Sequence, residues 1–546
     1  MAIEKIGDIL LKAKAVTKEE LEYGLNIQKS MKMNERIGRI LRYFNFAGDE
    51  EIARALAHQV GWKYFDKKYV IDIALIEKIG LEPFREWAFL PVKTERGPVF
   101  VFAHPFATAA SDCLSKHGLC DKDCYVGSEG VIRHYLENLA NRQKGEEIEK
   151  KISLIKEKGM VGNELKELAD RLLDEAIVQG ASDIHIEPEE KISTVRFRID
   201  GMLYFRLTLS SDVHNNLVNI IFNKADITVS DFLKFHDARF QHNSMNRAVD
   251  VRVSCIPSCF GPALVLRLLD VNRTLITLEQ LGFERTHFDR IRRVTQKPHG
   301  IIIMAGPTGS GKTTTLYAIL NDLKSISTKV ITIEDPVEIK MPLVNQVQIN
   351  ERQGVTFACA TRAFLRHDPN IILIGEIRDA DTAQEAIRAA ITGHRVLSTL
   401  HTNTALDSVY RLHDLGIELS SIANSILAVI SQRLIRKLCL ACRRRVTVKK
   451  EKWPAFFKEQ FKTDESEIRA YKAVGCAVCQ GGYKGRTVIA EVLEFDAETK
   501  NMVAGGKLDL LRYKSMEIAH LDLKADAARL VLEGVTTFEE AERIIG

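Results

Sequence analysis

Long hydrophobic runs are absent from this chain of 546 residues. Its longest apolar strings, such as residues 301–305, have the length of a strand, whereas a membrane-spanning helix needs about 18 apolar residues. Glu4, Lys5 and Asp8 lie among the first apolar residues, which is not the pattern of a secretory signal. We therefore expect a protein that works in the cytoplasm.

Cysteine and proline are scarce, and neither sign of charge dominates. The ten cysteines are too few for a disulfide scaffold, and 13 prolines with 33 glycines exclude a collagen-like or low-complexity sequence. The 77 basic and 73 acidic side chains leave a net charge of +4, so only local patches can favour an anionic partner. Hydrophobic residues make up 45% of the chain, and its length predicts several domains.

Four segments are predicted from the patterning. Residues 1–140 indicate an N-terminal module with helical and α+β parts, and residues 141–162 a charged linker. Residues 163–272 open with a helical pattern and continue with strand-like alternation, which predicts a second α+β domain. In residues 273–546 buried strands alternate with helices, which predicts an α/β domain with a mainly parallel sheet covered on both faces.

The first 60 residues contain a tandem repeat. The pattern that begins with Ile6-Gly7 and ends at Gln28 recurs from Ile37-Gly38 to Gln59, with an offset of 31 residues. Apolar residues three and four apart predict short amphipathic helices in each copy.

A phosphate-binding loop is indicated by residues 306–313, GPTGSGKT, which fit the pattern GxxxxGK[ST]. A strand-like run precedes them and a helical pattern follows from Thr314 to Leu323, which disfavours a chance glycine-rich turn. Glycines let backbone N–H groups turn toward phosphate oxygens, Lys312 supplies a cation and Thr313 a hydroxyl for Mg²⁺. The predicted nucleotide-binding residues are Gly306, Thr308, Gly309, Ser310, Gly311, Lys312, Thr313 and Thr314.

Carboxylates end two other strand-like runs. Glu376 follows residues 371–374, and Glu334 and Glu338 follow the run at 330–333. At the carboxyl end of a parallel sheet such groups can bind Mg²⁺ through water or orient an attacking water. His401 stands after another strand, where it could hydrogen-bond a phosphate or a carboxylate. A solvated turn and a structural histidine are the alternatives.

Two CxxC pairs predict a structural metal site. Cys439, Cys442, Cys476 and Cys479 have the pattern of a tetrahedral Cys₄ zinc site, with redox disulfides as the alternative. The neighbouring residues 431–452 are strongly basic and suit an anionic lipid, an acidic partner or simply solvent. Without interleaved aromatic residues to stack bases, we expect no nucleic acid.

Together these motifs resemble the ATPases of the type II secretion and type IV pilus assembly superfamily. Residues 331–339 (ITIEDPVEI) are similar to its Asp box, residues 371–379 to its atypical Walker B motif and residues 398–403 (STLHTN) to its His box. The loop at 306–318 and the stretch ASDIHIEP at 181–188, which resembles the family's second N-terminal domain, complete the set.

The resemblance implies a RecA-like P-loop ATPase domain, an α+β N-terminal domain, a small helical N-terminal module and a Cys₄ zinc insert at 436–484. It implies that Glu338 or Glu334 activates water while Glu376 serves the metal. Arg252 and Arg267 match positions that reach bound nucleotide, with a surface salt bridge as the alternative reading.

The implied protein is a homohexameric motor in the cytoplasm, peripheral to the inner membrane, that hydrolyses Mg²⁺-ATP to drive assembly of type IV pili or type II secretion pseudopili. Its implied partners are an inner-membrane platform protein and a cytoplasmic-membrane adaptor. A pilus retraction motor, which would lack the tetracysteine insert, and a nucleotide-binding scaffold are the alternatives.

The tandem repeat resembles the N-terminal domain of these ATPases, some of which bind cyclic di-GMP there. Arg36 and Gln59 fit that pattern, whereas Lys5 replaces the first arginine. A docking module for a membrane partner is the other reading of this segment.

Overall fold

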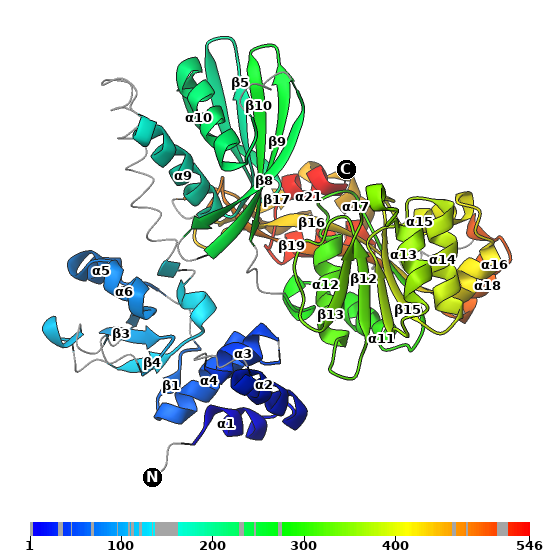
Figure 1. The fold of residues 1–546 in the computed structure, drawn as a ribbon, viewed down its shortest axis with the longest axis horizontal. Helices are drawn as coiled ribbons and strands as arrows, with labels where there is room; N and C mark the ends of the chain where they lie inside the picture. Colours follow the sequence, from blue (N-terminus) through cyan, green and yellow to red (C-terminus); the bar gives the residue numbers. More distant parts are fainter. Residues whose placement is uncertain are drawn as a thin grey trace. The chain divides into compact units, whose positions relative to one another are not determined.

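The chain forms two compact units, Met1–Asn272 and Arg273–Gly546 (Figure 1). None of the described helices is long and apolar enough to cross a membrane. The computed structural model describes residues 4–30, 36–44, 46–66, 70–94, 97–106, 110, 114–119, 123–133, 135–136, 162–228, 234–244, 247–270, 276–460, 466–476, 479–509 and 522–545.

The first part of unit 1 begins with two helical hairpins. They consist of α1 (Ile6–Lys12), α2 (Lys18–Ser30), α3 (Ile37–Tyr43) and α4 (Asp49–Val60). The helices α3 and α4 begin 31 residues after α1 and α2, the same offset as in the sequence repeat. Apolar residues of both hairpins, among them Leu10 and Leu41, are buried in one shared cluster because their spacing puts them on one face of each helix.

A small α/β layer follows the hairpins. Its sheet has the order β1-β4-β3-β2 and packs around buried aromatic residues such as Phe84, Phe89 and Phe100. Its elements are β1 (Lys63–Tyr64), α5 (Ile73–Ile79), α6 (Glu82–Trp87), β2 (Phe89–Thr94), β3 (Gly97–Phe102) and β4 (Cys124–Val126).

The second part of unit 1 is a six-stranded antiparallel sheet of order β7-β6-β5-β10-β9-β8. The helices α9 (Gly162–Val178) and α10 (Ser211–Lys224) cover one face, and their apolar residues share its core (Figure 1). The turn at Asp200-Gly201 has φ values of 50° and 85°, as a two-residue hairpin requires. The strands are β5 (Ala181–Pro188), β6 (Ile192–Ile199), β7 (Met202–Ser210), β8 (His236–Ser244), β9 (Arg247–Ser258) and β10 (Gly261–Asp270).

Unit 2 is built on a seven-stranded sheet of order β13-β12-β14-β15-β11-β16-β19. All neighbouring strands are parallel except β16 and β19, which confirms the expected mixed α/β fold with a mainly parallel sheet. The strands are β11 (Gly300–Ala305), β12 (Val330–Glu334), β13 (Val344–Gln348), β14 (Ile371–Ile374), β15 (Arg395–Leu400), β16 (Ile426–Leu438) and β19 (Tyr483–Glu494).

Both faces of this sheet are buried. In β11, Ile301 and Ile303 contribute to one core cluster and Ile302 and Met304 to the other, because side chains alternate along a strand. The helices α11 (Arg285–Thr295) and α12 (Lys312–Leu323) pack in the second cluster. The first cluster holds α13 (Phe357–Phe364), α14 (Ala380–Ile391), α15 (Ala405–Asp414), α16 (Leu419–Ser425) and α18 (Ala497–Ala504).

The end of unit 2 adds a separate small core beside β16 and β19. There the carboxylate of Glu540 accepts hydrogen bonds from Arg436 Nη2 at 2.6 Å and Arg543 Nε at 2.8 Å. The elements of this region are β17 (Arg444–Lys449), α17 (Ala455–Gln460), β18 (Glu467–Lys472), α20 (Leu523–Leu532) and α21 (Phe538–Ile545).

Candidate functional site

The loop between β11 and α12 holds the sequence-predicted phosphate-binding residues. Gly306, Gly309 and Gly311 have φ values of 144°, 79° and 89°, which side chains rarely tolerate. A Cβ atom at Gly306 would stand 2.7 Å from the carbonyl oxygen of Gln432 on β16. The loop can therefore adopt this tight curve only because glycines occupy these positions.

Lys312, the first residue of α12, turns its side chain back over this loop. Its Nζ donates to the carbonyl oxygens of Gly306 at 2.7 Å and Pro307 at 3.1 Å. Burial lowers the pKa of Lys312 to about 8, with Glu376 opposing this shift and Arg433 adding to it. A cation held by carbonyl oxygens beside a glycine-rich loop is suited to exchange those contacts for phosphate oxygens.

Glu376 and His401, which the sequence places 25 positions apart, meet at the carboxyl ends of β14 and β15. The Nε2 atom of His401 lies 3.4 Å from Glu376 Oε2, and Arg378 donates to the other carboxylate oxygen. Partial burial and the charge of Lys312 lower the pKa of His401. These side chains can hydrogen-bond a metal-bound water or interact with the charge of a bound phosphate.

Glu334 and Glu338 have different surroundings. Glu334 is buried at the end of β12, and its carboxylate accepts hydrogen bonds from Tyr317, from Thr332 Oγ1 at 2.5 Å and from Gln346 Nε2 at 3.1 Å. The Glu338 side chain is exposed. Of the two, Glu338 is the carboxylate that solvent can reach.

Two residues on β16 that sequence reasoning missed lie beside the loop. Gln432 is fully buried, donates from Nε2 to Ser310 O at 2.7 Å and accepts from Thr315 Oγ1 at 2.9 Å. Arg433 donates to the carbonyl oxygens of Gln432 and Asn403, each at 3.0 Å. No local motif marks these residues, and only the pairing of β16 with β11 brings them under the loop.

Arg252 and Arg267 lie on unit 1, directly opposite each other on β9 and β10. Arg239 on β8 pairs with Arg252 on its other side, so three arginines cross one face of the sheet in register. Arg267 Nε donates to Asp183 Oδ1 at 3.0 Å, while its side chain remains 63% exposed. The structure thus brings the two predicted arginines together on a surface.

The four predicted metal ligands form a single cluster. Cys439 and Cys442 follow β16, Cys476 and Cys479 precede β19, and their sulfur atoms all lie within 4.8 Å of one another. Four thiols at this separation fit the donor set of a tetrahedral metal ion.

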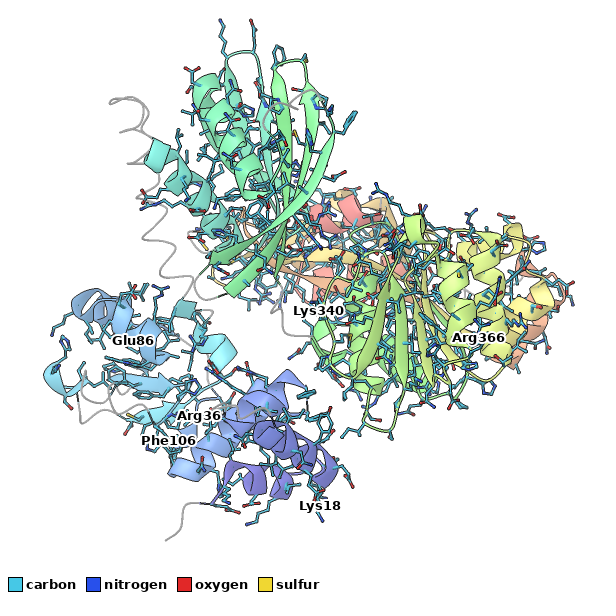
Figure 2. The ribbon with its side chains drawn as sticks, in the orientation of Figure 1. Lys18, Arg36, Glu86, Phe106, Lys340 and Arg366 are labelled. Atoms are coloured by element: carbon cyan, nitrogen blue, oxygen red, sulfur yellow. The ribbon has the colours of Figure 1, made fainter. Side chains whose placement is uncertain are left out.

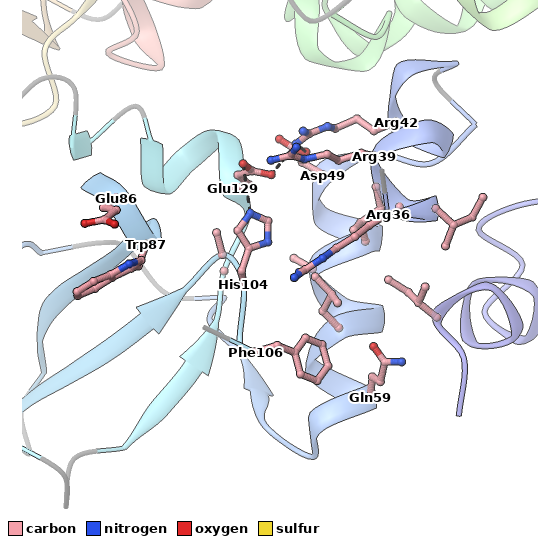
Figure 3. Close-up of a pocket in the computed structure, with 18 residues that line it drawn as sticks. Arg36, Arg39, Arg42, Asp49, Gln59, Glu86, Trp87, His104, Phe106 and Glu129 are labelled. Atoms are coloured by element: carbon pink, nitrogen blue, oxygen red, sulfur yellow. Dashed lines mark hydrogen bonds and ion pairs between the residues drawn. The ribbon is translucent and has the colours of Figure 1, made fainter. Parts of the chain in front are cut away.

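A cavity of about 690 Å³ lies between the helical hairpins and the small α/β layer of unit 1 (Figure 3). Arg36 at the start of α3 points toward His104, while Phe106 and Gln59 lie farther along the cavity (Figure 3). Figure 2 shows Arg36 and Phe106 in this first part of the chain. Among the residues that the structure describes, the Arg36 guanidinium has no hydrogen-bond or ion-pair partner.

One rim of this cavity is an ionic cluster. Arg42 on α3 contacts Asp49 at 2.7 Å and Glu129 at 3.2 Å, and Glu129 also contacts His104 and Arg133. Although burial opposes ionisation, hydrogen bonds from His104 and Arg133 hold the pKa of Glu129 well below its usual range. These contacts join the hairpins to the α/β layer.

Comparison with known proteins identifies close relatives. A family model described as "Type II/IV secretion system protein" matches residues 161–543. The type II secretion system ATPase E of Vibrio cholerae is 41% identical over 378 residues, which are 69% of this chain and 74% of that protein. The type IV pilus assembly ATPase PilB of Thermus thermophilus is 34% identical over 517 residues, which are 90% of this chain and 57% of that protein.

The fold also has a counterpart among solved structures. The X-ray structure of the Legionella pneumophila ATPase DotB covers 68% of this chain and 94% of its own, with a TM-score of 0.51 and 23% identity. That likeness concerns the fold alone. The family model spans more than half of this chain and covers its nucleotide loop, carboxylates and cysteines, so the chain belongs to the type II/IV secretion system protein family, a family of ATPases.

Proposed function

We propose that this protein is a motor ATPase that drives type II secretion or assembly of type IV pili. The observation that carries the proposal is the site in unit 2, where the glycine loop, Lys312, Glu376 and His401 meet at one edge of a parallel sheet. In open α/β sheets this edge binds ligands. The two relatives are named as a type II secretion ATPase and a type IV pilus assembly ATPase, which indicates the processes that ATP hydrolysis would drive.

Each residue has a role that its surroundings support. Backbone N–H groups of residues 306–314 and the Lys312 ammonium bind the phosphates of ATP. The Thr313 hydroxyl and the Glu376 carboxylate would hold Mg²⁺, which when bound neutralises charge on the phosphates. Exposed Glu338 activates the attacking water, and His401 keeps Glu376 in place through their 3.4 Å contact.

The arginine pair of unit 1 is proposed to stabilise the transition state. Arg252 and Arg267 present two guanidinium groups on one sheet face, and such groups neutralise charge that develops on the γ-phosphate. Closing the arginine-bearing domain on ATP would couple hydrolysis to movement. If the arginines act across subunits of a hexamer, specific activity rises with protein concentration, whereas a fully active dilute monomer would contradict that arrangement.

Turnover of ATP by the purified full-length protein tests the proposal. Lys312→Ala should lower phosphate release to background, because the loop then lacks its cation. The matched control is Arg366→Ala, an exposed position shortly after α13 that is away from the proposed machinery. A wild-type protein that neither binds nor hydrolyses ATP with Mg²⁺ would refute the proposal. Full activity in Lys312→Ala would refute the assigned site.

The assignment of the parts follows from this function. Residues 273–546 are a RecA-like ATPase domain, residues 163–272 a second N-terminal domain and residues 1–140 a docking module. The linker expected at residues 141–162 lies outside the described residues except for Gly162, which begins α9. The motor works in the cytoplasm at the inner membrane, with a platform protein and an adaptor as partners. A retraction motor would lack the cysteine insert, and a non-hydrolysing scaffold would have no need of Glu338.

A structural zinc ion is proposed for the cysteine cluster, within the insert at 436–484. Metal analysis of the purified protein should give one zinc per chain, and Cys442→Ser should lower it. Cys359→Ser is the matched control because Cys359 is an exposed free cysteine outside the cluster. Protein that is folded and free of zinc would contradict this site.

The cavity in unit 1 supports a second, regulatory function, the binding of cyclic di-GMP. An unpartnered Arg36 and an exposed Phe106 that line the same cavity offer a cation and an aromatic face, which suit an anionic nucleotide. Calorimetric titration should detect binding that Arg36→Ala abolishes and that Lys18→Ala, at an exposed position on α2, retains. If the wild-type protein does not bind it, the segment is a docking module alone.

A further inference from the structure

Gln432 is held in one orientation beneath the phosphate-binding loop. It is fully buried on β16, and both ends of its amide are engaged: Oε1 accepts from Thr315 Oγ1 at 2.9 Å and Nε2 donates to Ser310 O at 2.7 Å. Because the carbonyl oxygen of Ser310 can only accept a hydrogen bond, it fixes the NH₂ end of the amide toward the loop, and the Thr315 hydroxyl holds the other end. Since the sheet pairs β16 with β11 from Ile301 to Ala305, the backbone that carries Gln432 is as fixed as the strand that starts the loop.

The contact with Ser310 sets the direction of one peptide group. In a trans peptide the N–H points opposite to the C=O. With Ser310 O directed at Gln432, the N–H of Gly311 points away from Gln432. A Cβ atom at Gly311 would lie 2.9 Å from Gln432 Nε2, so the glycine and the amide are in close contact.

That N–H group is free to bind a ligand. In the part of the chain that the structure describes, the backbone N–H groups of Gly311, Lys312 and Thr313 have no acceptor. They lie at the N-terminus of α12, a helix of 12 residues, where unpaired donors and the helix dipole attract anions. The Ser310–Gly311 peptide is the last one before this helix, so its orientation decides whether the row of donors includes Gly311.

We propose that Gln432 is a positioning residue for nucleotide binding: its side-chain amide holds the Ser310–Gly311 peptide so that the Gly311 N–H joins the donors that bind the β-phosphate. The inference rests on the proposed function of the loop. Gln432 does not contact the nucleotide itself, because the loop lies between them. Loss of its donor leaves Ser310 O without a partner, and the peptide then becomes free to rotate.

The test compares Gln432→Met with wild type in titrations with ADP and with inorganic pyrophosphate. Methionine has nearly the same length and volume but no hydrogen-bonding amide. We expect the Kd for both ligands to rise by about 10–100-fold, as the loss of one buried hydrogen bond would give. A loss for pyrophosphate as large as that for ADP locates the defect at the phosphates rather than at the base.

Thr536→Val is the matched control. It removes one buried hydrogen bond, from Thr536 Oγ1 to Arg436 O at 2.9 Å, in the same unit and away from the loop. It should lose thermal stability and keep the wild-type Kd. If Gln432→Met binds ADP as tightly as wild type, or if both variants weaken binding equally, the inference is wrong.

Thr315→Val provides a second test should Gln432→Met fail to fold. It keeps Gln432 and its bond to Ser310 O but removes the hydrogen bond that holds Oε1, so the amide is held less firmly. A smaller rise in Kd is therefore expected, and an unchanged Kd would contradict the proposed positioning role. Wild-type protein that fails to bind ADP would refute the proposed function instead, so the two failures are distinguishable.

Discussion

The hydroxyl of Tyr317 on α12 donates a hydrogen bond to the buried carboxylate of Glu334 at the end of β12. Burial, together with the negative charge of Glu334, raises the pKa of Tyr317 and keeps it protonated. Because Tyr317 lies five residues after Lys312 on the same helix, this bond ties the helix of the nucleotide loop to the neighbouring strand. We therefore propose that Glu334 is a structural anchor and that Glu338 is the base.

Replacing Glu338 should affect ATP hydrolysis, whereas replacing Glu334 should affect stability. In Glu338→Gln, ATP hydrolysis should fall by about 100-fold or more while ATP still binds, because a general base contributes at least that much. In Glu334→Gln, the melting temperature should fall. Measured rates, ATP affinities and melting curves distinguish the two, and an active Glu338→Gln protein would reverse the assignment.

Nucleotide binding should take up protons above about pH 8. The pKa of Lys312 is about 8 in the free protein, below its usual value of 10.5, and bound phosphate will raise it. In this range Lys312 of the free protein is therefore partly deprotonated and must bind a proton when the nucleotide binds. The affinity for nucleotide consequently weakens as pH rises. Calorimetry at about pH 8.5, repeated in buffers of different ionisation enthalpy, measures this proton uptake.

Lys324→Met is the control for this measurement. Burial also lowers the pKa of Lys324 to about 8, yet this residue lies at the other end of α12. The variant should keep the proton uptake of wild type. Uptake that disappears in Lys324→Met would show that Lys312 is not its source.

Glu540 should stabilise unit 2 at neutral pH and lose this effect in acid. Although burial opposes ionisation, hydrogen bonds from Arg543 and Arg436 lower the pKa of Glu540 from 4.5 to about 2. A lowered carboxyl pKa adds stability above pH 4.5 that is lost as pH falls from 4.5 toward 2. Glu540→Gln should lower the free energy of unfolding at pH 7 by about 3 kcal/mol.

Urea unfolding at several pH values tests the role of Glu540. The difference between Glu540→Gln and wild type should shrink below pH 4.5. The control is Glu539→Gln, an exposed neighbour on α21 that should match wild type throughout. A difference that does not change with pH would argue for a packing effect rather than a charge effect.

Replacing either proposed arginine finger should reduce turnover without unfolding the sheet. Arg252→Ala and Arg267→Ala should lower kcat by about 1,000-fold, as loss of an arginine finger does in other nucleotide hydrolases. Arg196→Ala, which removes an ion pair with Glu187 on the same sheet, is the control and should keep its activity. Full activity in both finger variants would leave the arginines as surface residues.

Sequence patterns predicted the elements whose signal is local. The run at 301–305 predicts the strand observed as Gly300–Ala305, and the helix expected from Thr314 to Leu323 is observed at Lys312–Leu323. Buried strands and glycine loops can be recognised because their residues are adjacent in the chain. The phosphate-binding loop and the cysteine pairs belong to the same class.

The parts that sequence could not predict depend on contacts between distant segments. Glu334 and Glu338 are only four residues apart in the chain. The Glu334 side chain is buried against Tyr317 and Gln346, whereas the Glu338 side chain is exposed. Gln432 is more than 100 residues from the loop that it contacts. The spacing of residues along the chain does not predict such contacts, because they form only when the strands have assembled in their order in the sheet.

The paired strands β16 and β19 reach from the nucleotide loop to the cysteine cluster. Gln432 pairs with Ala490 near the middle of these strands, Leu438 pairs with Tyr483 at their end, and the two cysteine pairs lie just beyond. A metal ion bound by these cysteines would link the ends of the two strands and limit how far they can separate or slide. Loss of that metal ion would therefore weaken phosphate binding at the other end of the two strands.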